Sequence, residues 1–306
     1  MIDWKPVVAE SAYAASHLVW LYVPWALWAY WHARSGAVNR TGGLTALAGR
    51  LLLASLFVWM RMVEPNWITR EETAIAVGAR ARIVLVSDLH LGAYKGAAFV
   101  ERLAARINAE AADCVLIAGD FLYAPRFPVD TLLAPLKGIK QPVYAVLGNH
   151  DRHELGPGLT ETQEIALVDQ ALERAGVRLI ENQIVDCGGV AIAGVGDRWS
   201  GREDLRMVRA HQGSRPLVML THNPDTALDL NAPPVKLMLA AHTHGGQIRI
   251  PWLYKKVLPV QGPFDKGLHA PLRPGAPPVF VTSGLGETAL PMRLFNPPVI
   301  DVILLH

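Results

Sequence analysis

The sequence predicts an α/β domain over residues 80–306, preceded by a membrane-associated helical segment over residues 1–70. Two observations predict this division. Seven of the nine tryptophans fall within the first 70 residues, in long apolar stretches with few charges. Beyond residue 80, short runs rich in β-branched residues alternate with stretches of helical periodicity, which is the pattern of an α/β layer fold.

The composition limits the classes of protein to which this chain can belong. With 306 residues, of which 51% are apolar, the chain can bury a large core and does not need disulfide bonds to fold. Its formal net charge of +2 is spread along the chain, so we expect no nucleic-acid partner. Cys114 lies in an apolar run and Cys187 precedes a Gly-Gly pair, which fits neither metal-ligand spacing nor a disulfide framework. We expect both to be ordinary core thiols.

The N-terminal segment predicts one or two transmembrane helices. Residues 11–33 contain no Asp, Glu, Lys or Arg, and this length of helix can cross a hydrocarbon core of roughly 30 Å. Residues 41–60 are apolar apart from Arg50 and form the weaker candidate, because their uninterrupted apolar run is short. A soluble helical cap on the α/β domain is the alternative. Arg34 and Arg40 are balanced by basic residues on the opposite flank, so charge does not choose a side of the membrane.

The α/β domain shows seven strand patterns and two amphipathic helices. Strands are expected at residues 83–86, 115–118, 143–147, 190–195, 217–220, 235–239 and 279–281. Helices are expected at residues 98–112 and 161–175, where apolar residues recur at helical spacing. Open α/β sheets bind ligands at the carboxyl ends of their strands, so the residues that follow each strand are the informative ones.

Five of these strands run directly into a polar cluster. The clusters are Ser-Asp-Leu-His-Leu-Gly (87–92), Gly-Asp (119–120), Gly-Asn-His-Asp (148–151), Thr-His-Asn-Pro-Asp (221–225) and Ala-His-Thr-His-Gly-Gly (241–246). Carboxylate oxygens and imidazole nitrogens suit Mn, Fe or Zn, and the Asp-x-His and His-x-His spacings let alternate residues converge. Each cluster alone is typical of a turn or a helix cap. Together they predict a site for divalent metal ions.

The order and spacing of the five clusters resemble the calcineurin-like metallophosphoesterases, over about residues 82–306. The His-Thr-His-Gly-Gly-Gln block, Gly-Leu-Gly at 284–286 and Pro291-Met-Arg293 are similar to the membrane-linked bacterial phosphodiesterase branch of that superfamily. That branch includes enzymes that cleave the pyrophosphate of UDP-2,3-diacylglucosamine in lipid A synthesis. The resemblance implies a β-sandwich flanked by helices and a site for two metal ions.

The resemblance also implies roles for individual residues. One metal ion would be held by Asp88, His90 and His244, and the other by Asn149, His222 and His242. Asp120 would bridge the two ions. His150 would face the substrate as a general acid or as a stabiliser of phosphoryl charge, with Asp151 orienting its ring. Two ions placed in this way can activate water and hold the phosphoryl oxygens, so the expected chemistry is phosphoester hydrolysis.

The expected protein is therefore a bacterial inner-membrane hydrolase, with Mn as the first guess for its two metal ions and a lipid-linked phosphoester such as UDP-2,3-diacylglucosamine as its substrate. Two alternatives stay open. A phosphatase for soluble or protein phosphoesters would keep its activity when residues 1–70 are removed. A membrane scaffold that retains the fold without turnover would tolerate the loss of Asp120.

Other residues are weaker candidates for contacts with substrate or membrane. Arg152, His153, Arg198 and Arg293 are candidate phosphate contacts, with a solvated surface role as the alternative. The apolar stretch at residues 251–254, followed by Lys255 and Lys256, could rest on the bilayer, or it is an ordinary loop or edge strand.

Overall fold

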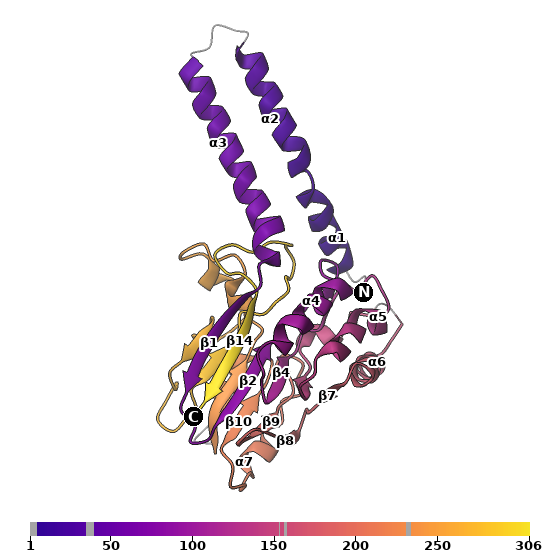
Figure 1. The fold of residues 1–306 in the computed structure, drawn as a ribbon, viewed down its shortest axis with the longest axis vertical. Helices are drawn as coiled ribbons and strands as arrows, with labels where there is room; N and C mark the ends of the chain where they lie inside the picture. The colour runs from indigo at the N-terminus through magenta and orange to yellow at the C-terminus, as the bar shows by residue number, and fades with distance from the viewer. Residues whose placement is uncertain (1–4, 35–39, 153, 156–157, 231–233) are drawn as a thin grey trace.

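The structure, a computed structural model, describes residues 5–34, 40–152, 154–155, 158–230 and 234–306. Its main body is a sandwich of two six-stranded β-sheets, and a helical hairpin projects from one end of that body (Figure 1). The mixed α/β architecture expected from the sequence is therefore present.

The first sheet is built mainly from the first half of the domain. Its strands lie in the order β1 (Thr69–Ile75), β14 (Val299–Leu305), β2 (Ala81–Val86), β4 (Cys114–Ala118), β6 (Val143–Val146) and β7 (Val177–Leu179). Strands β2, β4, β6 and β7 are parallel, whereas β14 runs antiparallel to β2 and parallel to β1. The carboxyl ends of β2, β4 and β6 therefore lie at the edge where β1 begins.

The second sheet is built from the second half of the domain. Its order is β12 (Gly267–His269), β13 (Val279–Val281), β11 (Val235–Ala240), β10 (Leu217–Leu220), β9 (Val190–Gly194) and β8 (Gln183–Cys187). The four central strands are parallel, and the edge strands β12 and β8 are antiparallel to their neighbours. A small parallel pair, β3 (Leu91–Gly92) and β5 (Leu122–Tyr123), lies apart from both sheets. All seven strands expected from the sequence are present.

The two sheets share one hydrophobic core. Ile83 and Leu116 of the first sheet pack with Ile192 and Leu237 of the second, and all four are completely buried. Burying apolar side chains from both inner faces is the main force that holds such a sandwich together.

Helices cover the outer face of the first sheet. They are α4 (Ala97–Asn108), α5 (Val129–Leu133) and α6 (Glu161–Arg174). Helix α4 packs on the sheet through Phe99, Leu103 and Ile107, which are spaced four apart and so share one face. Helix α6 begins with a capping box between Thr160 and Gln163. Both expected helices are thus present, although the first ends at Asn108. A short helix, α7 (Arg206–Arg209), lies in the chain between β9 and β10.

The hairpin consists of α1 (Lys5–Ser16), α2 (Val19–Arg34) and α3 (Arg40–Val58), with α2 and α3 lying side by side. A turn at residues 17–18 separates α1 from α2, so the expectation of one unbroken helix over residues 11–33 is wrong. A π turn (Trp59–Val63) and a 3-10 turn (Glu64–Asn66) extend α3. Within the described residues, the helix over Leu44–Asn66 is the one long and apolar enough to cross a membrane, with a mean hydropathy of 1.6.

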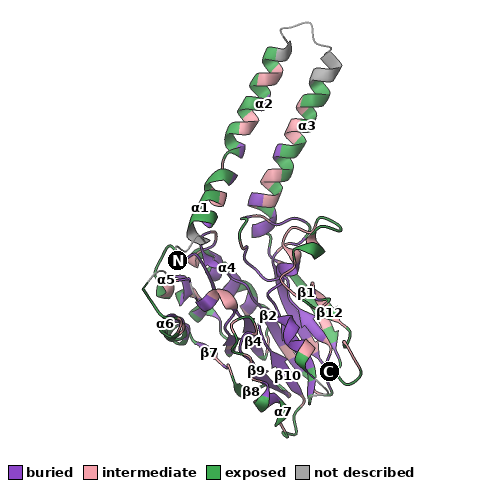
Figure 2. Cartoon of the chain, turned by 180° about the vertical axis from the view of Figure 1, so that it is seen from behind, coloured by how far each residue is buried: buried purple, intermediate pink, exposed green. Residues whose placement is uncertain are grey.

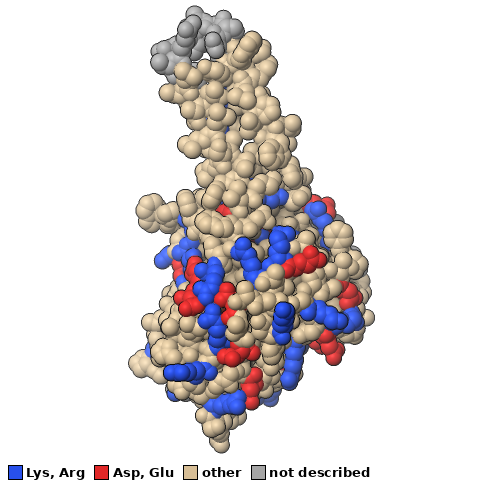
Figure 3. Space-filling model, in the orientation of Figure 1, with Lys and Arg blue, Asp and Glu red and all other residues tan. Residues whose placement is uncertain are grey.

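The surface of the hairpin differs from that of the sandwich. Its helices are largely exposed in Figure 2, although their side chains are apolar, including Trp20, Trp28, Leu52 and Leu53. In Figure 3 the charged side chains lie on the sandwich, while the visible face of the hairpin is almost entirely uncharged. Arg50 is an exception within α3, and its guanidinium lies 5.6 Å from the centre of the Trp25 ring of α2.

A disulfide bond between Cys114 and Cys187 joins the two sheets. The expectation of two ordinary thiols is therefore wrong. The cysteines are 73 residues apart in sequence, but β4 and β8 bring their Cα atoms within 5.8 Å of each other in the sandwich. Sequence spacing could not show this, because only the packing of the sheets makes the two strands neighbours.

Replacing both cysteines with alanine is expected to lower the free energy of unfolding by roughly 2–4 kcal/mol, because the bond restricts the unfolded chain over a long loop. Thermal unfolding of the wild type with and without reductant would check this, with the double variant as reference. A wild type that unfolds at the same temperature in both conditions would contradict the prediction.

Candidate functional site

The five polar clusters meet at one end of the sandwich. Each follows the carboxyl end of a central strand, β2, β4 and β6 in the first sheet and β10 and β11 in the second. This is also the end at which β1 begins, directly after the helix of the hairpin. The candidate site and the hairpin therefore share one end of the domain (Figure 1).

The backbone at these strand ends is unusual. Asp88, His90, Asp120, His242 and His244 all have positive φ angles, between 44° and 71°. Residues other than glycine avoid this region, and such strain is found where the surrounding structure holds it for a function.

Two groups of side chains place their donor atoms close enough to bind a metal ion. The first contains Asp88, His90, Asp120 and His244, and the second contains Asp120, His222 and His242. Within each group the donor atoms lie within 4.8 Å of one another, and all these residues are buried. Asp120 belongs to both groups. Its Oδ2 lies 3.5 Å from Nε2 of His90 and 3.2 Å from Nε2 of His222.

Backbone carbonyl groups fix which imidazole nitrogens face inward. Nδ1 of His222 lies 2.7 Å from the Ala118 oxygen, and Nε2 of His242 lies 3.1 Å from the Pro259 oxygen. A carbonyl oxygen only accepts, so those nitrogens carry the protons. The opposite nitrogens, Nε2 of His222 and Nδ1 of His242, face each other at 3.1 Å. When His222 is unprotonated, both nitrogens offer a lone pair to a shared cation.

In the first group a carbonyl orients only one of the two imidazoles, since Nδ1 of His90 is buried without a hydrogen-bond partner among the residues that the structure describes. Nδ1 of His244 lies 3.3 Å from the Gly286 oxygen, which leaves Nε2 facing Nε2 of His90 at 3.0 Å. Oδ1 of Asp88 and Oδ1 of Asn149 are buried, and neither has a hydrogen-bond partner within the described part of the chain. Unpaired buried oxygens are costly unless a cation or donor reaches them, so these atoms fit a metal-binding role.

The electrostatics also suit cation binding. Burial lowers the pKa of His90 and His244, and it lowers the pKa of His242 to about 3, so these imidazoles are neutral near pH 7. Burial also disfavours the charge on His222, but Asp120 outweighs it and raises the pKa of His222 to about 10. A proton therefore competes with a cation for Nε2 of His222.

His150 is paired with a residue that the sequence did not suggest. Its Nδ1 lies 2.9 Å from Oε1 of Glu154, a buried carboxylate four residues further along the chain. Both oxygens of Asp151 instead accept backbone N–H groups, from Gly148, Asp120, Phe121 and Leu122. The expectation that Asp151 orients the ring of His150 is therefore corrected, because Asp151 holds the strand-end loops and Glu154 holds the ring.

Replacing Glu154 with glutamine is expected to lower kcat about tenfold with little change in KM, because the ring of His150 loses its carboxylate partner. The variant keeps an oxygen for the Ala124 N–H, which Glu154 Oε2 accepts at 2.7 Å. Steady-state kinetics would check this, with Asp301→Asn as a control at a buried carboxylate on β14 that does not pair with His150. An unchanged kcat would assign the ring's orientation to other contacts.

The arginines expected as candidate phosphate contacts lie in ion pairs instead. Arg152 is buried and pairs with Glu161 and Glu181, and Arg198 pairs with Glu203 and Asp229. Arg293 is completely buried and pairs with Glu287. The surface role offered as the alternative is also wrong for Arg152 and Arg293. His153 lies outside the described residues.

A buried network joins the base of the hairpin to the site. Oε1 of Glu64 accepts the Asn296 backbone N–H at 2.6 Å, and the Asn296 side-chain amide donates to the His244 oxygen at 2.7 Å. Arg293 donates to the Gly286 oxygen at 2.6 Å, the same carbonyl that contacts His244. Removing residues 1–70 would delete Glu64. That truncation therefore does not separate a membrane role from support of the site.

A cavity of about 650 Å³ opens beside the donor groups. Asp120, Asn149, His150 and the two histidines of the His-Thr-His block form its polar end. Most of its remaining wall is apolar and includes Ile248, Ile250, Leu253, Leu258 and Leu290. Trp199, which the sequence did not single out, lies at the polar end with its ring 4.5 Å from that of His242.

Comparisons with known proteins bear on this site. The family model described as calcineurin-like phosphoesterase matches residues 81–246, more than half of the chain. The chain is 28% identical over 263 residues to phosphodiesterase YaeI of Escherichia coli (strain K12), covering 82% of this chain and 93% of that protein. It is 27% identical over 270 residues to the uncharacterized metallophosphoesterase YkuE of Bacillus subtilis (strain 168), covering 84% and 92%.

More distant similarities extend to a protein with a named substrate. The chain is 24% identical over 326 residues to UDP-2,3-diacylglucosamine pyrophosphatase LpxG of Chlamydia muridarum, covering 87% of this chain and 97% of that protein. Among solved structures, the protein TT1561 of Thermus thermophilus superposes with a TM-score of 0.40 at 16% identity, covering 67% of this chain and 90% of that chain.

Proposed function

Because the chain belongs to the calcineurin-like phosphoesterase family, we propose that it uses two divalent metal ions to hydrolyse a phosphodiester or pyrophosphate bond in a lipid-linked substrate. The observation that carries this proposal is the sharing of Asp120 between two groups of donor atoms. A shared carboxylate can bridge a pair of neighbouring ions.

Six of the proposed ligands belong to these groups, and the seventh, Asn149, is proposed from its buried, unpaired Oδ1. One ion would be held by Asp88, His90 and His244, the other by Asn149, His222 and His242, with Asp120 between them. Oxygen and nitrogen ligands of this kind suit Mn, Fe or Zn, and we propose Mn as the first metal to test. When bound, the two ions would supply an activated water and bind the phosphoryl oxygens.

His150 is proposed to act on the substrate itself. Its backbone N–H donates to Oδ1 of Asp120 at 2.9 Å, which fixes the residue beside the bridging carboxylate, and its side chain lines the cavity. Glu154 holds the ring from the other side. His150 would donate a proton or a hydrogen bond to the leaving oxygen.

The shape of the cavity supports a substrate with an apolar part. Its polar end suits a phosphate group, and its long apolar wall suits acyl chains rather than a fully hydrated phosphoester. Relatives named as a phosphodiesterase and as a UDP-2,3-diacylglucosamine pyrophosphatase support this assignment. UDP-2,3-diacylglucosamine is the most specific substrate that we propose.

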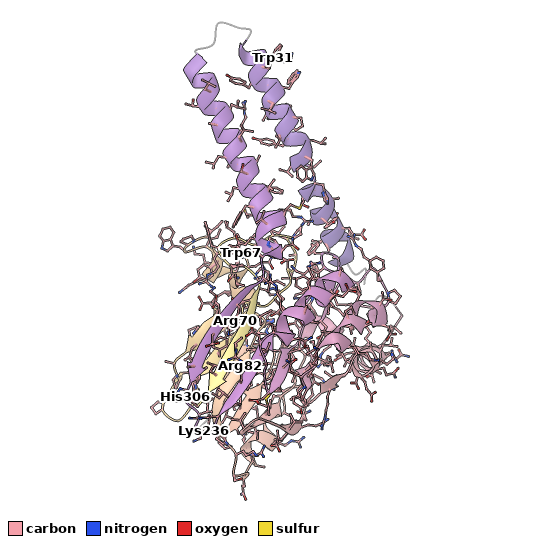
Figure 4. The ribbon with its side chains drawn as sticks, in the orientation of Figure 1. Trp31, Trp67, Arg70, Arg82, Lys236 and His306 are labelled. Atoms are coloured by element: carbon pink, nitrogen blue, oxygen red, sulfur yellow. A yellow bond between two sulfur atoms is a disulfide. The ribbon has the colours of Figure 1, made fainter. Side chains whose placement is uncertain are left out.

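The hairpin and the disulfide support a location at a bacterial membrane. The helix over Leu44–Asn66 would cross the bilayer, with Trp31 near the far end of the hairpin and Trp67 at its base (Figure 4), as expected for aromatic residues at the two interfaces. Disulfide bonds persist in oxidising compartments, so we propose that the sandwich lies outside the cytoplasm. A UDP-linked intermediate is made in the cytoplasm, so on the outer side a lipid phosphodiester headgroup is the alternative candidate substrate.

The purified full-length protein, in mild detergent with Mn²⁺, is expected to hydrolyse bis-p-nitrophenyl phosphate and to lose this activity with a chelator. UDP-2,3-diacylglucosamine and phosphatidylglycerol would be tested beside it. Turnover of one lipid but not the other would choose between the two substrates. Turnover of the generic diester alone would retain the chemistry and overturn the lipid assignment. Turnover that persists with the chelator would overturn the two-metal proposal, and absent turnover would favour a scaffold.

A further inference from the structure

Residues 250–257 form a loop with unusually exposed apolar side chains. The side chain of Trp252 is 87% exposed, that of Val257 70% and that of Leu253 53%. Lys255 and Lys256 lie between them and are also exposed. Large apolar side chains clustered on a surface and flanked by lysines are typical of a segment that enters a membrane interface.

Backbone hydrogen bonds connect this loop to the base of the hairpin. The Arg249 N–H donates to the Leu294 oxygen at 2.9 Å, and the Leu294 N–H donates to the Gln247 oxygen at 3.1 Å. Arg293, which precedes Leu294, donates its N–H to the oxygen of Met60 at 2.9 Å. Met60 lies in the π turn that extends α3 at the base of the hairpin. The loop and the hairpin therefore leave the same end of the domain, opposite Lys236 and His306 in Figure 4.

Side-chain contacts with the rest of the domain fix the conformation of this loop. The Arg249 guanidinium lies 4.1 Å from the centre of the Tyr254 ring and 3.0 Å from Asp265, and the Tyr254 hydroxyl donates to Asp265 at 3.0 Å. These contacts bind Tyr254 to the domain, while Trp252 stays exposed. The exposed side chains are thus presented by an anchored loop.

The same loop borders the mouth of the active-site cavity, where Leu253 and Val257 contribute both to the cavity wall and to the exposed surface. Ile250, Leu253 and Val257 line the cavity whose polar end contains Asp120 and His150. One short segment therefore connects the outer surface beside the hairpin with the interior of the cavity. A lipid that leaves the bilayer at this loop would meet an apolar path to the phosphoryl site without crossing water.

We propose that residues 250–257 are an interfacial anchor that inserts Trp252 and its apolar neighbours into an anionic lipid bilayer at the mouth of the cavity. Lys255 and Lys256 pair with anionic headgroups, which orients the mouth towards the membrane. This inference rests on the proposed function, because it supplies the route by which a lipid-linked substrate reaches the metal site. It is separate from the crossing of the membrane by the hairpin.

The chain permits a direct test of insertion, because both native cysteines are in the disulfide. Full-length Trp252→Cys, labelled with the fluorophore NBD, is reconstituted in phosphatidylcholine vesicles that contain roughly one-third anionic phosphatidylglycerol. It is expected to emit at shorter wavelength than Lys236→Cys labelled in the same way in the same vesicles. Nitroxide lipids labelled near the headgroup should quench it. Lys236→Cys, at the opposite end of the domain, is the matched control and should behave as in water.

Leu52→Cys, on the exposed apolar surface of the hairpin, separates the possible failures. Protection of Leu52→Cys together with a water-like Trp252→Cys would overturn the anchor and leave the membrane hairpin intact. A water-like signal at both positions would overturn the anchor and the membrane location together.

A second measurement does not depend on the label. Lys255→Glu combined with Lys256→Glu is expected to lower the ratio of lipid turnover to bis-p-nitrophenyl phosphate turnover about tenfold in anionic mixed micelles, with the effect lost in neutral micelles. Lys236→Glu should leave the ratio unchanged. An unchanged ratio in the double variant would show that Lys255 and Lys256 do not contribute to the anchor.

Discussion

Replacing Asp120 with asparagine is expected to lower kcat/KM for phosphodiester hydrolysis by about three orders of magnitude. Asp120 is the one residue that belongs to both donor groups found in the described part of the chain, so its negative charge acts on both proposed ions at once. An asparagine keeps the oxygen that accepts the His150 N–H but loses that charge. The bound metal should fall from two ions per chain to one or fewer.

Metal content measured by mass spectrometry would accompany the kinetics, so that the result does not depend on activity alone. Asp301→Asn is the matched control, since Asp301 of β14 is also a buried aspartate but lies in neither donor group. Two tightly bound ions and near-normal turnover in Asp120→Asn would show that Asp120 does not bridge the ions.

Replacing Gly148 with alanine is expected to abolish metal binding and to destabilise the fold by roughly 1–3 kcal/mol. A Cβ atom at this position would lie 2.1 Å from Oδ1 of Asp120 and 2.7 Å from its backbone nitrogen. Neither atom can move away easily, because Oδ1 accepts the His150 N–H and the Asp120 N–H is bonded to Asp151. The methyl group must therefore displace the bridging carboxylate.

Metal titration and thermal unfolding of the same samples would measure both effects. Gly96→Ala is the matched control, because a Cβ atom at Gly96 meets nothing within 4 Å. If Gly148→Ala bound two ions with wild-type affinity, the close packing of the strand-end loops around Asp120 would not be required for the site.

Several features of the fold followed from local pattern. Short β-branched runs predicted most of the central strands, because a strand buried on both faces must be apolar along its whole length. The buried strand β14, which pairs with β1 and β2 inside the first sheet, was not among them. The edge strand β1 was missed, since its exposed Arg70, Glu71 and Glu72 hide the strand pattern. One or two apolar helices were expected within residues 1–70, but the turn at residues 17–18 between α1 and α2 was not.

The candidate site was predictable because its residues follow the strands directly. Parallel strands bring their carboxyl ends to one edge, so Asp88, Asp120 and Asn149 meet without any further information. The partners of these residues were not predictable. Glu154 reaches His150 only through the fold of the intervening loop, and Asp151 is turned to the backbone N–H groups instead.

The sequence by itself determined the family, the α/β class and the set of metal-binding candidates, since each depends on residues that are close in the chain or on strand ends. The tertiary structure alone decided which distant groups meet. It paired Cys114 with Cys187 across the sandwich, buried Arg293 beneath the site and joined Glu64 of the hairpin to Asn296 beside His244. The disulfide spans 73 residues of sequence and the Glu64–Asn296 contact spans 232, and no local periodicity encodes a contact over such separations.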